Sequence, residues 1–550
     1  MSVGLKLMPN RKSATFTVPV TFRTITLLSS FFTSPLDIFT LFLYPKPFNE
    51  PRQQYHHNPF LCIRQGRRYQ EKVMSGLILV SHNMSHPSTL SALYKSILTR
   101  RHGLSLWIGW DGKTAEVSSD TPREFTFSSG QDYDSLTFPL SQAELQDGYM
   151  SYVHKGLWPV FHQRPDLARF SQPGLTQYRK LNEAYALAIA EYAMPDDVIW
   201  VQDYHLIPCI QLIRHAGLTN RTGFFFHQPF PAGQGFEAIP DWRWLAESLL
   251  CCDVIGFQTL QDMKNFLLWV ESEFRTERLG ATCFRIFGRI ITTGVFPVGI
   301  DLDDVDSLSH TAGCTVTEQE CRETLPENTV LSGGHLDDSA GLPYRISAME
   351  VLLRRHQEYV GNIMLLQLAS PSAGYSHRAA EMSHELETLC GELNGVKGTL
   401  DWYPVNFLTR QYSREEQAGI YRASRVAVVT PLIAGMSLMA KMYVALQDPA
   451  NPGVLILSQF AGASEHMDGA IIVNPYDPDA IADAIHTALH LSLSERKKMH
   501  ARLMAGIKRW DCHWWAASFL TALETIESEA AVPLSGGMAL SACFTHRIRY

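Results

Sequence analysis

Short apolar runs that end at polar clusters recur through the middle of the chain. Three of them occupy Val198–Val201, Gly223–Phe226 and Val254–Phe257. These runs are rich in β-branched and aromatic residues and are bounded by turn residues, which is typical of buried parallel strands. Between the first two runs, Cys209–Ala216 is apolar at helical spacing. The pattern therefore predicts a strand–helix–strand unit.

Polar side chains follow each of these three predicted strands. They are Gln202, Asp203, Tyr204 and His205, then His227 and Gln228, then Gln258 and Thr259. In an open parallel sheet, ligands bind beyond the carboxyl ends of the strands. Because a sugar carries many hydroxyl groups that each need a hydrogen-bonding partner, this row of side chains predicts a carbohydrate site.

The alternation of strand and helix continues on both sides of this unit. Further strands are predicted at Gly76–Ser81, Leu104–Trp110, Val330–Gly334, Asn362–Leu368, Val426–Thr430, Gly453–Ser458 and Ala470–Val473. Further helices are predicted at Ser91–Leu98, Tyr178–Tyr192, Gly341–Gln357, Ser376–Leu393, Arg414–Ala423, Ala480–Leu489 and Ser494–Ile526, while Thr114–Leu140 alternates weakly, as a hairpin or loop does. The pattern predicts an α/β fold of two Rossmann-like, doubly wound domains that face a cleft.

The chain divides into four predicted segments. Residues 1–74 mix Ser, Thr, Phe and Pro with an excess of basic residues, unlike the rest of the chain. This composition fits a disordered extension, a stretch translated from an early start, or a targeting peptide, and we favour the first two over the third. Residues 75–300 form the first predicted domain, residues 301–528 the second with a terminal helix, and residues 529–550 a loose tail.

Composition and charge exclude some classes of function. The chain has 550 residues, enough for two large cores, and its net charge of -8 argues against non-specific nucleic-acid binding. Its ten cysteines lack metal-binding spacing, which favours reduced thiols in a cytoplasmic protein. The most apolar stretch, Thr24–Tyr44, contains Pro35 and Asp37, so we predict no membrane span.

Seven collinear motifs between Ser75 and Ile526 resemble those of trehalose-6-phosphate synthases. They read DYHLIP, GFFFHQPFP, DVIGFQT, FPVGI, VTPLxxGMSL, QDPANPGVLILSQFAGA and IIVNPYD. That family consists of retaining glycosyltransferases of the GT-B type, which transfer glucose from a nucleotide sugar, usually UDP-glucose, to glucose 6-phosphate. The resemblance implies a nucleotide-sugar site on the second domain, a sugar-phosphate site on the first, and no metal or cofactor.

The acceptor side of the family pattern is present in part. Tyr149 and Trp158 match the aromatic residues of the family's acceptor pocket. Asp203 matches the carboxylate to which the hydroxyl groups of the acceptor sugar donate hydrogen bonds. His227 matches the histidine that faces the transferring sugar, so the resemblance assigns Asp203 and His227 to catalysis. Without the resemblance, a tryptophan such as Trp158 is more often part of a core, whereas Asp and His at strand ends fit a site better.

The donor side departs from the family pattern at its two cations. The family reads Arg–Leu–Asp–Tyr–Ser–Lys–Gly at the strand that opens the second domain, and its Arg and Lys hold the donor diphosphate. Here His335 stands in place of the Arg and Ala340 in place of the Lys. Asp338 replaces the family's Tyr and adds negative charge. A protonated His335 would restore part of one charge at low pH.

Two further motifs also depart from the pattern. Where the family reads Asp–Gly–Met–Asn–Leu, followed by a ribose-binding Glu, this chain has Ala434, Gly435, Met436, Ser437 and Leu438, then Met442. Backbone N–H groups at this predicted helix start would hold an anion weakly. The first strand ends in His82 and Asn83 where the family has an Arg that contacts the acceptor phosphate, the aligned loop over the donor, Ser85–Leu90, lacks glycine, and Ala373 replaces a further phosphate-binding Arg.

These losses predict a degraded donor site on an intact scaffold. A hydrogen bond to a charged group contributes about 1.5–3 kcal/mol, and each 1.4 kcal/mol is about tenfold in binding. Three hypotheses follow. The first is a synthase-like protein with weak or no transfer, a pseudoenzyme that regulates or partners an active paralogue or forms a homo-oligomer. The second is a working synthase, and the third is a transferase with another donor or acceptor. We favour the first.

Overall fold

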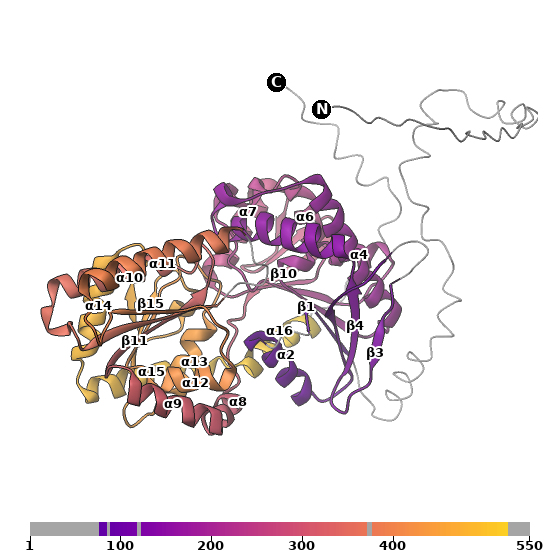
Figure 1. The fold of residues 1–550 in the computed structure, drawn as a ribbon. Helices are drawn as coiled ribbons and strands as arrows, with labels where there is room; N and C mark the ends of the chain where they lie inside the picture. Colours follow the sequence, from indigo (N-terminus) through magenta and orange to yellow (C-terminus); the bar gives the residue numbers. More distant parts are fainter. Residues whose placement is uncertain (1–75, 85–87, 118–122, 371–376, 526–550) are drawn as a thin grey trace, which may run out of the picture. The chain divides into compact units, whose positions relative to one another are not determined.

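The computed structural model describes residues 76–84, 88–117, 123–370 and 377–525 (Figure 1). All of them belong to one unit of the chain, Asn58–Tyr550. The predictions for residues 1–74, for residues 529–550 and for Ala373 lie outside the described residues. The described part contains two sheets, each built mainly from parallel strands, as the sequence pattern predicts.

The first sheet has ten strands among the described residues. Their order is β3-β4-β2-β1-β5-β6-β7-β10-β9-β8, and the central strands from β4 to β10 are parallel. The strands are β1 (Leu77–Asn83), β2 (Ser105–Thr114), β3 (Thr126–Ser128), β4 (Asp134–Leu140), β5 (Val198–Gln202), β6 (Thr222–Phe225), β7 (Val254–Phe257), β8 (Glu277–Arg278), β9 (Cys283–Ile286) and β10 (Arg289–Val295).

Helices cover both faces of this sheet because its strands are apolar on both sides. The helical segments are α2 (Thr89–Arg100), η2 (Glu144–Leu157), α3 (Trp158–Phe161), η3 (Pro165–Leu167), α4 (Gln172–Tyr192), η4 (Tyr204–Leu206), α5 (Ile207–His215), η5 (Gly233–Ala238), α6 (Trp242–Leu249) and α7 (Leu260–Glu273). Ile199 and Val201 pack with α4 to α7 on one face, whereas Trp200 packs with α2 on the other.

The second sheet has six strands among the described residues, all parallel, in the order β13-β12-β11-β14-β15-β16. The strands are β11 (Asn328–His335), β12 (Ile363–Ser370), β13 (Val405–Leu408), β14 (Val426–Val429), β15 (Val454–Ser458) and β16 (Ile471–Val473). The helical segments are α8 (Leu302–Ser309), α9 (Ala312–Thr324), α10 (Leu342–Arg355), η6 (Gln357–Tyr359), α11 (His377–Lys397), α12 (Arg414–Ala423), α13 (Leu438–Leu446), η7 (Gly462–Glu465), α14 (Pro478–His490), α15 (Leu493–Arg509) and α16 (Cys512–Glu524).

Neighbouring residues of a strand in the second sheet face opposite layers. Val330 packs with α10, α11 and α14, whereas Leu331 packs with α8, α12, α13 and α15. Figure 1 shows α10, α11 and α14 along one side of β11 and β15, with α12 and α13 along the other. This doubly wound arrangement confirms the predicted fold class.

Each sheet has one point at which the strand order reverses. In the first sheet the chain runs outward from β1 through β2 to β4 and then returns to β5, on the other side of β1. In the second sheet it runs from β11 through β12 to β13 and then returns to β14. Ligands of open α/β sheets bind at such switch points. A ligand site is therefore expected at the carboxyl ends of β1, β5, β11 and β14.

The structure corrects three predicted elements. Thr114–Leu140 contains an antiparallel pair, β3 and β4, but β4 also joins β2 in parallel. The helix predicted from Tyr178 begins at Gln172, because Ser171 caps it and Pro173 fits the first turn. The helix predicted over Ser494–Ile526 is two helices, α15 and α16, with Asp511 capping the second.

Helix α16 returns to the first sheet after the second is complete. Trp515 and Phe519 of α16 lie against Trp200 of β5, at centroid distances of 4.9 and 4.8 Å. A Cβ added at Gly223 or Gly256 would come within 2.7 Å of the Phe519 ring, so glycine at these positions makes room for the helix. The domain boundaries drawn from the sequence stay predictions, but the terminal helix packs on the first sheet.

None of the helices in the described ranges is long and apolar enough to cross a membrane. The predicted cytoplasmic location stays a prediction.

Candidate functional site

His227 lies two residues beyond β6, in an aromatic enclosure. Its Nε2 atom is 3.0 Å from Gln202 Oε1 and 3.0 Å from the Tyr94 hydroxyl. The rings of Tyr94, Phe225 and Trp515 surround the imidazole edge to face. Burial lowers the pKa of His227 to about 3, so the imidazole is neutral at physiological pH.

Asp203 joins the end of β5 to His227. Its Oδ1 atom accepts hydrogen bonds from the backbone N–H groups of Tyr204 at 3.0 Å and His227 at 3.3 Å. The backbone of Asp203 has φ of +67°, in the region that favours glycine, and such strain costs about 1–3 kcal/mol and clusters at functional sites. Burial raises the pKa of the carboxyl to about 7, although its hydrogen bonds oppose this shift.

The buried carboxyl of Asp203 should make the stability of the folded protein depend on pH. The unfolded carboxyl ionises near pH 4 and the folded one near pH 7. Stability is therefore lost as pH rises from about 4 to 7, because the unfolded chain releases this proton first. Asp203→Asn keeps an oxygen for both backbone N–H groups and should raise stability at pH 8 by about 1–4 kcal/mol, with little change at pH 4. Thermal unfolding at both pH values measures this.

An exposed aspartate supplies the control for that prediction. Asp132 lies on an exposed turn, so Asp132→Asn should change the melting temperature equally little at pH 4 and pH 8. If Asp203→Asn destabilises the protein at pH 8 as much as at pH 4, the carboxyl at position 203 is not held in the protonated form by burial.

Tyr149 lies on η2, a π-helical segment, among three histidines. Its ring stacks on His82 at 3.9 Å and meets His154 edge to face at 4.6 Å, while His205 lies 5.6 Å away. Burial lowers the pKa of His82 to about 3 and that of His154 to about 4. The Nε2 atoms of both rings are buried and have no hydrogen-bond partner among the described residues. Neutral, unpartnered imidazole nitrogens of this kind suit a ligand hydroxyl.

Trp158 is the first residue of α3. Through His162, it is linked to the strand end beside His227 and to the loop after β11. Its ring stacks on His162 at 4.0 Å, and His162 Nδ1 lies 2.8 Å from the Trp158 carbonyl oxygen. Burial lowers the pKa of His162, while Gln228 and Asp337 act in the opposite direction. Trp158 is therefore held by a histidine that interacts both with the strand end beside His227 and with the loop after β11.

The loop after β11 carries the first two predicted donor positions. His335 is exposed at the end of the strand, whereas Ala340 is buried. Asp337 Oδ1 accepts from Ser339 N at 2.9 Å and from Ser339 Oγ at 2.7 Å, which fixes the turn. Gly341 has φ of +70°, and a Cβ there would meet the Thr430 carbonyl oxygen at 2.5 Å. The loop is thus tightly shaped but presents neither lysine nor arginine at the two positions.

A buried arginine, which the sequence analysis missed, holds this loop from behind. Arg345 donates to Ser332 Oγ at 2.8 Å and to the Gly333 carbonyl at 2.9 Å. It also donates to the Ala340 carbonyl at 2.6 Å and to Thr430 Oγ1 at 2.9 Å. Burial lowers its pKa to about 9, so the guanidinium is charged at neutral pH. In the sequence, an arginine on the apolar face of the predicted helix indicates such a buried residue.

The charge of Asp338 is compensated, contrary to the expectation from the sequence. Arg378, at the start of α11, donates from Nε at 3.0 Å and from Nη2 at 2.6 Å to Asp338 Oδ1. Arg164, after α3, interacts electrostatically with both Asp338 and Arg378 and is paired with Asp166 at 2.8 Å. The pairing could not be seen in the sequence because forty residues separate Asp338 from Arg378.

The motif around Gly435 meets His227. A Cβ added at Gly435 would lie 2.1 Å from the His227 carbonyl oxygen, so only glycine fits this approach. Ala434 bridges to Ala461, and Ser437 precedes α13 without a side-chain capping bond. The remaining predicted donor positions carry partly buried apolar side chains. They pack against the core that lies on the α8, α12, α13 and α15 side of the second sheet, and they are Met436, Leu438 and Met442.

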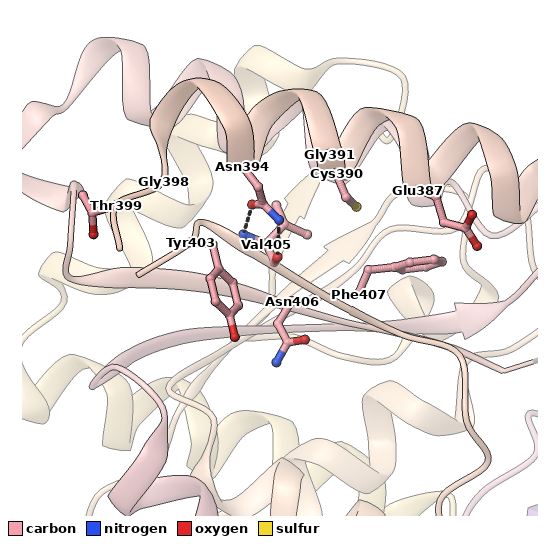
Figure 2. A pocket seen from close by; sticks show the side chains of 10 residues that line it. All are labelled: Glu387, Cys390, Gly391, Asn394, Gly398, Thr399, Tyr403, Val405, Asn406 and Phe407. Carbon is pink, nitrogen blue, oxygen red and sulfur yellow. Dashed lines mark hydrogen bonds between the residues drawn. The ribbon is translucent and has the colours of Figure 1, made fainter. Parts of the chain in front are cut away.

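The structure therefore brings Asp203, His227 and Gly435 together and places Tyr149 beside His82 at the same switch point, where β1 and β5 end. A hollow of about 500 Å³ lies elsewhere, between α11 and the start of β13 (Figure 2). It is lined by Glu387, Cys390, Gly391, Asn394, Gly398, Thr399, Tyr403, Val405, Asn406 and Phe407. None of the predicted site residues lines it, and their roles stay predictions.

Two doubly wound parallel sheets with polar side chains at their switch points define a GT-B glycosyltransferase fold. The sequence profile of Glycosyltransferase family 20 matches residues 72–525. The chain belongs to that family, which confirms the family predicted from the motifs.

Relatives and solved structures agree with this assignment. The trehalose-6-phosphate synthase of Citrobacter koseri is 36% identical over 465 residues, covering 84% of this chain and 98% of that protein. An E. coli trehalose-6-phosphate structure bound with UDP-2-fluoro glucose has a TM-score of 0.77 at 35% identity, covering 82% of this chain and 100% of that one. The UDP-forming α,α-trehalose-phosphate synthase of Burkholderia xenovorans, in complex with glucose 6-phosphate, has a TM-score of 0.76 at 32% identity, with 82% and 100% coverage.

Proposed function

We propose that this chain is a trehalose-6-phosphate synthase-like protein that binds a sugar phosphate and a nucleotide sugar but transfers glucose weakly or not at all. The observation that carries the proposal is the side-chain chemistry of the loop after β11. His335 and Ala340 stand where the family's two diphosphate-binding cations are expected. The nearby arginines are committed elsewhere: Arg345 to four acceptors behind the loop, and Arg378 to Asp338.

The missing cations matter most in the transition state. When a nucleoside diphosphate leaves a sugar, negative charge builds on its phosphate oxygens, and fixed positive groups lower that barrier. Each charged hydrogen bond contributes about 1.5–3 kcal/mol, so two missing cations correspond to a loss of about 100-fold or more. Arg345 still contributes a positive field from behind the loop, but its N–H groups are engaged.

The acceptor side supports retained binding. Tyr149, Asp203 and His227 lie at the switch point of the first sheet, and Asp203 is strained and buried there. The relatives' structures with UDP-2-fluoro glucose and with glucose 6-phosphate indicate the ligand classes to test.

The test of this function is release of UDP from UDP-glucose in the presence of glucose 6-phosphate. We expect a rate at least about 100-fold below that of an active family member assayed beside it. Calorimetry with UDP, UDP-glucose and glucose 6-phosphate separately should show sugar-phosphate binding stronger than nucleotide binding. Turnover equal to that of the active relative would contradict the proposal.

A second candidate is a transferase for an uncharged acceptor. His82, at the end of β1, is neutral, stacks on Tyr149 and leaves Nε2 unpartnered, which favours a hydroxyl over a phosphate. Repeating the assay with glucose in place of glucose 6-phosphate distinguishes the two. Faster UDP release with glucose would favour this candidate, and no release with either acceptor would favour the first.

A further inference from the structure

A group of histidines lies on the second sheet's outer layer, at the end of α10 farthest from the loop after β11. His356 directly follows α10, and Glu358 and Tyr359 belong to η6. His486 and His490 lie four residues apart on α14, so they share one face of that helix. Because α10 has 14 residues, the group is about 20 Å from the loop at its other end.

The distances within this group suit a metal ion. One ligand atom from each of His356, Glu358 and His486 lies within 4.8 Å of the others. Ligands of a tetrahedral ion, at about 2.0–2.2 Å from it, lie roughly 3.3–3.6 Å apart. The three side chains therefore need to move only a short distance toward one another to bind an ion. The rings of His356 and His486 stack at 3.9 Å with 15° between their planes. Two nearly parallel rings cannot both direct a lone pair at one ion, so one must turn on binding.

The other ring nitrogens already have the partners that metal-bound histidines have. His356 Nδ1 lies 3.2 Å from Glu358 Oε1, and His486 Nδ1 lies 2.9 Å from the Tyr359 hydroxyl. His490 Nδ1 lies 2.9 Å from the His486 carbonyl oxygen. Such outer contacts fix the tautomer and orientation of a ligating ring. They leave His486 Nε2 as its atom for an ion, whereas His356 Nδ1 and Glu358 Oε1, 3.2 Å apart, already lie close to the separation of two ligands of one ion.

The surrounding charge also favours a cation. Arg355 is paired with both Asp479 and Asp483 on α14. With Glu358, three carboxylates therefore stand against one guanidinium at this position, and the excess negative charge attracts a divalent ion. His356 and His486 are half-buried, so an ion can reach them from solvent.

We propose that His356, Glu358 and His486, with His490 beside them, form a site for a divalent transition-metal ion of the Zn²⁺ class. Imidazole and carboxylate ligands suit Zn²⁺, Ni²⁺ and Cu²⁺, whereas Mg²⁺ and Ca²⁺ prefer oxygen alone. The ion would join the end of α10 to α14. The proposal is independent of the glycosyltransferase site.

The experiment is equilibrium dialysis of the full chain against Zn²⁺ after treatment with a chelator, with Mg²⁺ as a second probe. We expect His486→Gln to lower the affinity of one Zn²⁺ site by about 100-fold, and Tyr359→Phe to lower it by about 10-fold. His384→Gln, which changes an exposed histidine on α11, should leave every site unchanged. Circular dichroism checks that the variants are folded.

A local readout separates this site from other zinc ligands of the chain. Zn²⁺ should protect His356 and His486, but not His384, from diethyl pyrocarbonate, as seen by peptide mass spectrometry. Equal Zn²⁺ binding by the native chain and His486→Gln would overturn the proposal. Lack of Zn²⁺ uptake by the native chain at micromolar concentration, or Mg²⁺ bound as tightly as Zn²⁺, would do so as well.

Discussion

Replacing His335 with Arg and Ala340 with Lys in one chain should raise the affinity for UDP by about 100-fold. The two changes restore permanent positive charge at the end of β11 and in the loop beside it, where a diphosphate would lie. His335 is exposed and can accept a longer side chain, and Gly334, next to the Ala340 Cβ, leaves room for the lysine stem. Two charged hydrogen bonds at about 1.5 kcal/mol each correspond to this factor. Calorimetry with UDP at fixed ionic strength measures it.

The single changes and a charge-matched pair are the controls. His335→Arg alone should give about a tenfold gain. His310→Arg with Gln319→Lys adds the same charge near and on α9, where both positions are exposed, and should leave UDP affinity within about twofold because exposed, distant charges are screened. If the double change at 335 and 340 leaves UDP affinity unaltered while the protein stays folded, the loop after β11 is not the diphosphate site.

Replacing Arg345 with Met should destabilise the protein by about 2–5 kcal/mol. The guanidinium is buried and donates to four acceptors that join β11, the loop at Ala340 and Thr430 after β14. Methionine fills much of the volume but leaves these acceptors without partners, and each unsatisfied buried group costs about 1–3 kcal/mol. Relief of the buried charge offsets part of this cost. Denaturant unfolding measures the change.

Arg354, in the last turn of the same helix, provides the matched comparison. Arg354 is exposed, so Arg354→Met should change stability by no more than about 0.5 kcal/mol. Arg345→Lys should fall between the two, because an ammonium group restores the charge but cannot reach all four acceptors at once. Equal stability of Arg345→Met and the native chain would show that the network contributes little.

Much of the fold follows from local patterns in the sequence. Val198–Val201 and Val254–Phe257 are confirmed as β5 and β7, because short β-branched runs between turn residues have few alternatives to a buried strand. The long predicted helix over Ser494–Ile526 is wrong as one element. Its apolar spacing continues across Asp511, but the Asp511 side chain accepts a hydrogen bond from Trp514 N and caps a second helix there. The chain at Trp510 also passes Gly299 so closely that a Cβ at Gly299 would lie 2.2 Å from the Trp510 carbonyl oxygen.

The candidate site divides in the same way. Asp203 and His227 are predicted as site residues from the sequence because each follows an apolar strand, and parallel strands place such residues at one edge. The enclosure of His227 by Trp515 could not be recognised, since the tryptophan lies almost three hundred residues later. The same holds for the pairing of Asp338 with Arg378, which corrected the expected local charge.

By itself, the sequence determined the family, the two sheets of mainly parallel strands, and the identities of the side chains at the strand ends, including the histidine and alanine at positions 335 and 340. The tertiary structure alone decided which charges are committed: Arg345 to the Ala340 carbonyl and three further acceptors, and Arg378 to Asp338. It also decided the close approach of Gly435 to the His227 carbonyl. The physical reason is that periodicity reports whether a residue is buried on its own element. Hydrogen bonds and ion pairs depend on distances of about 3 Å between elements far apart in the chain.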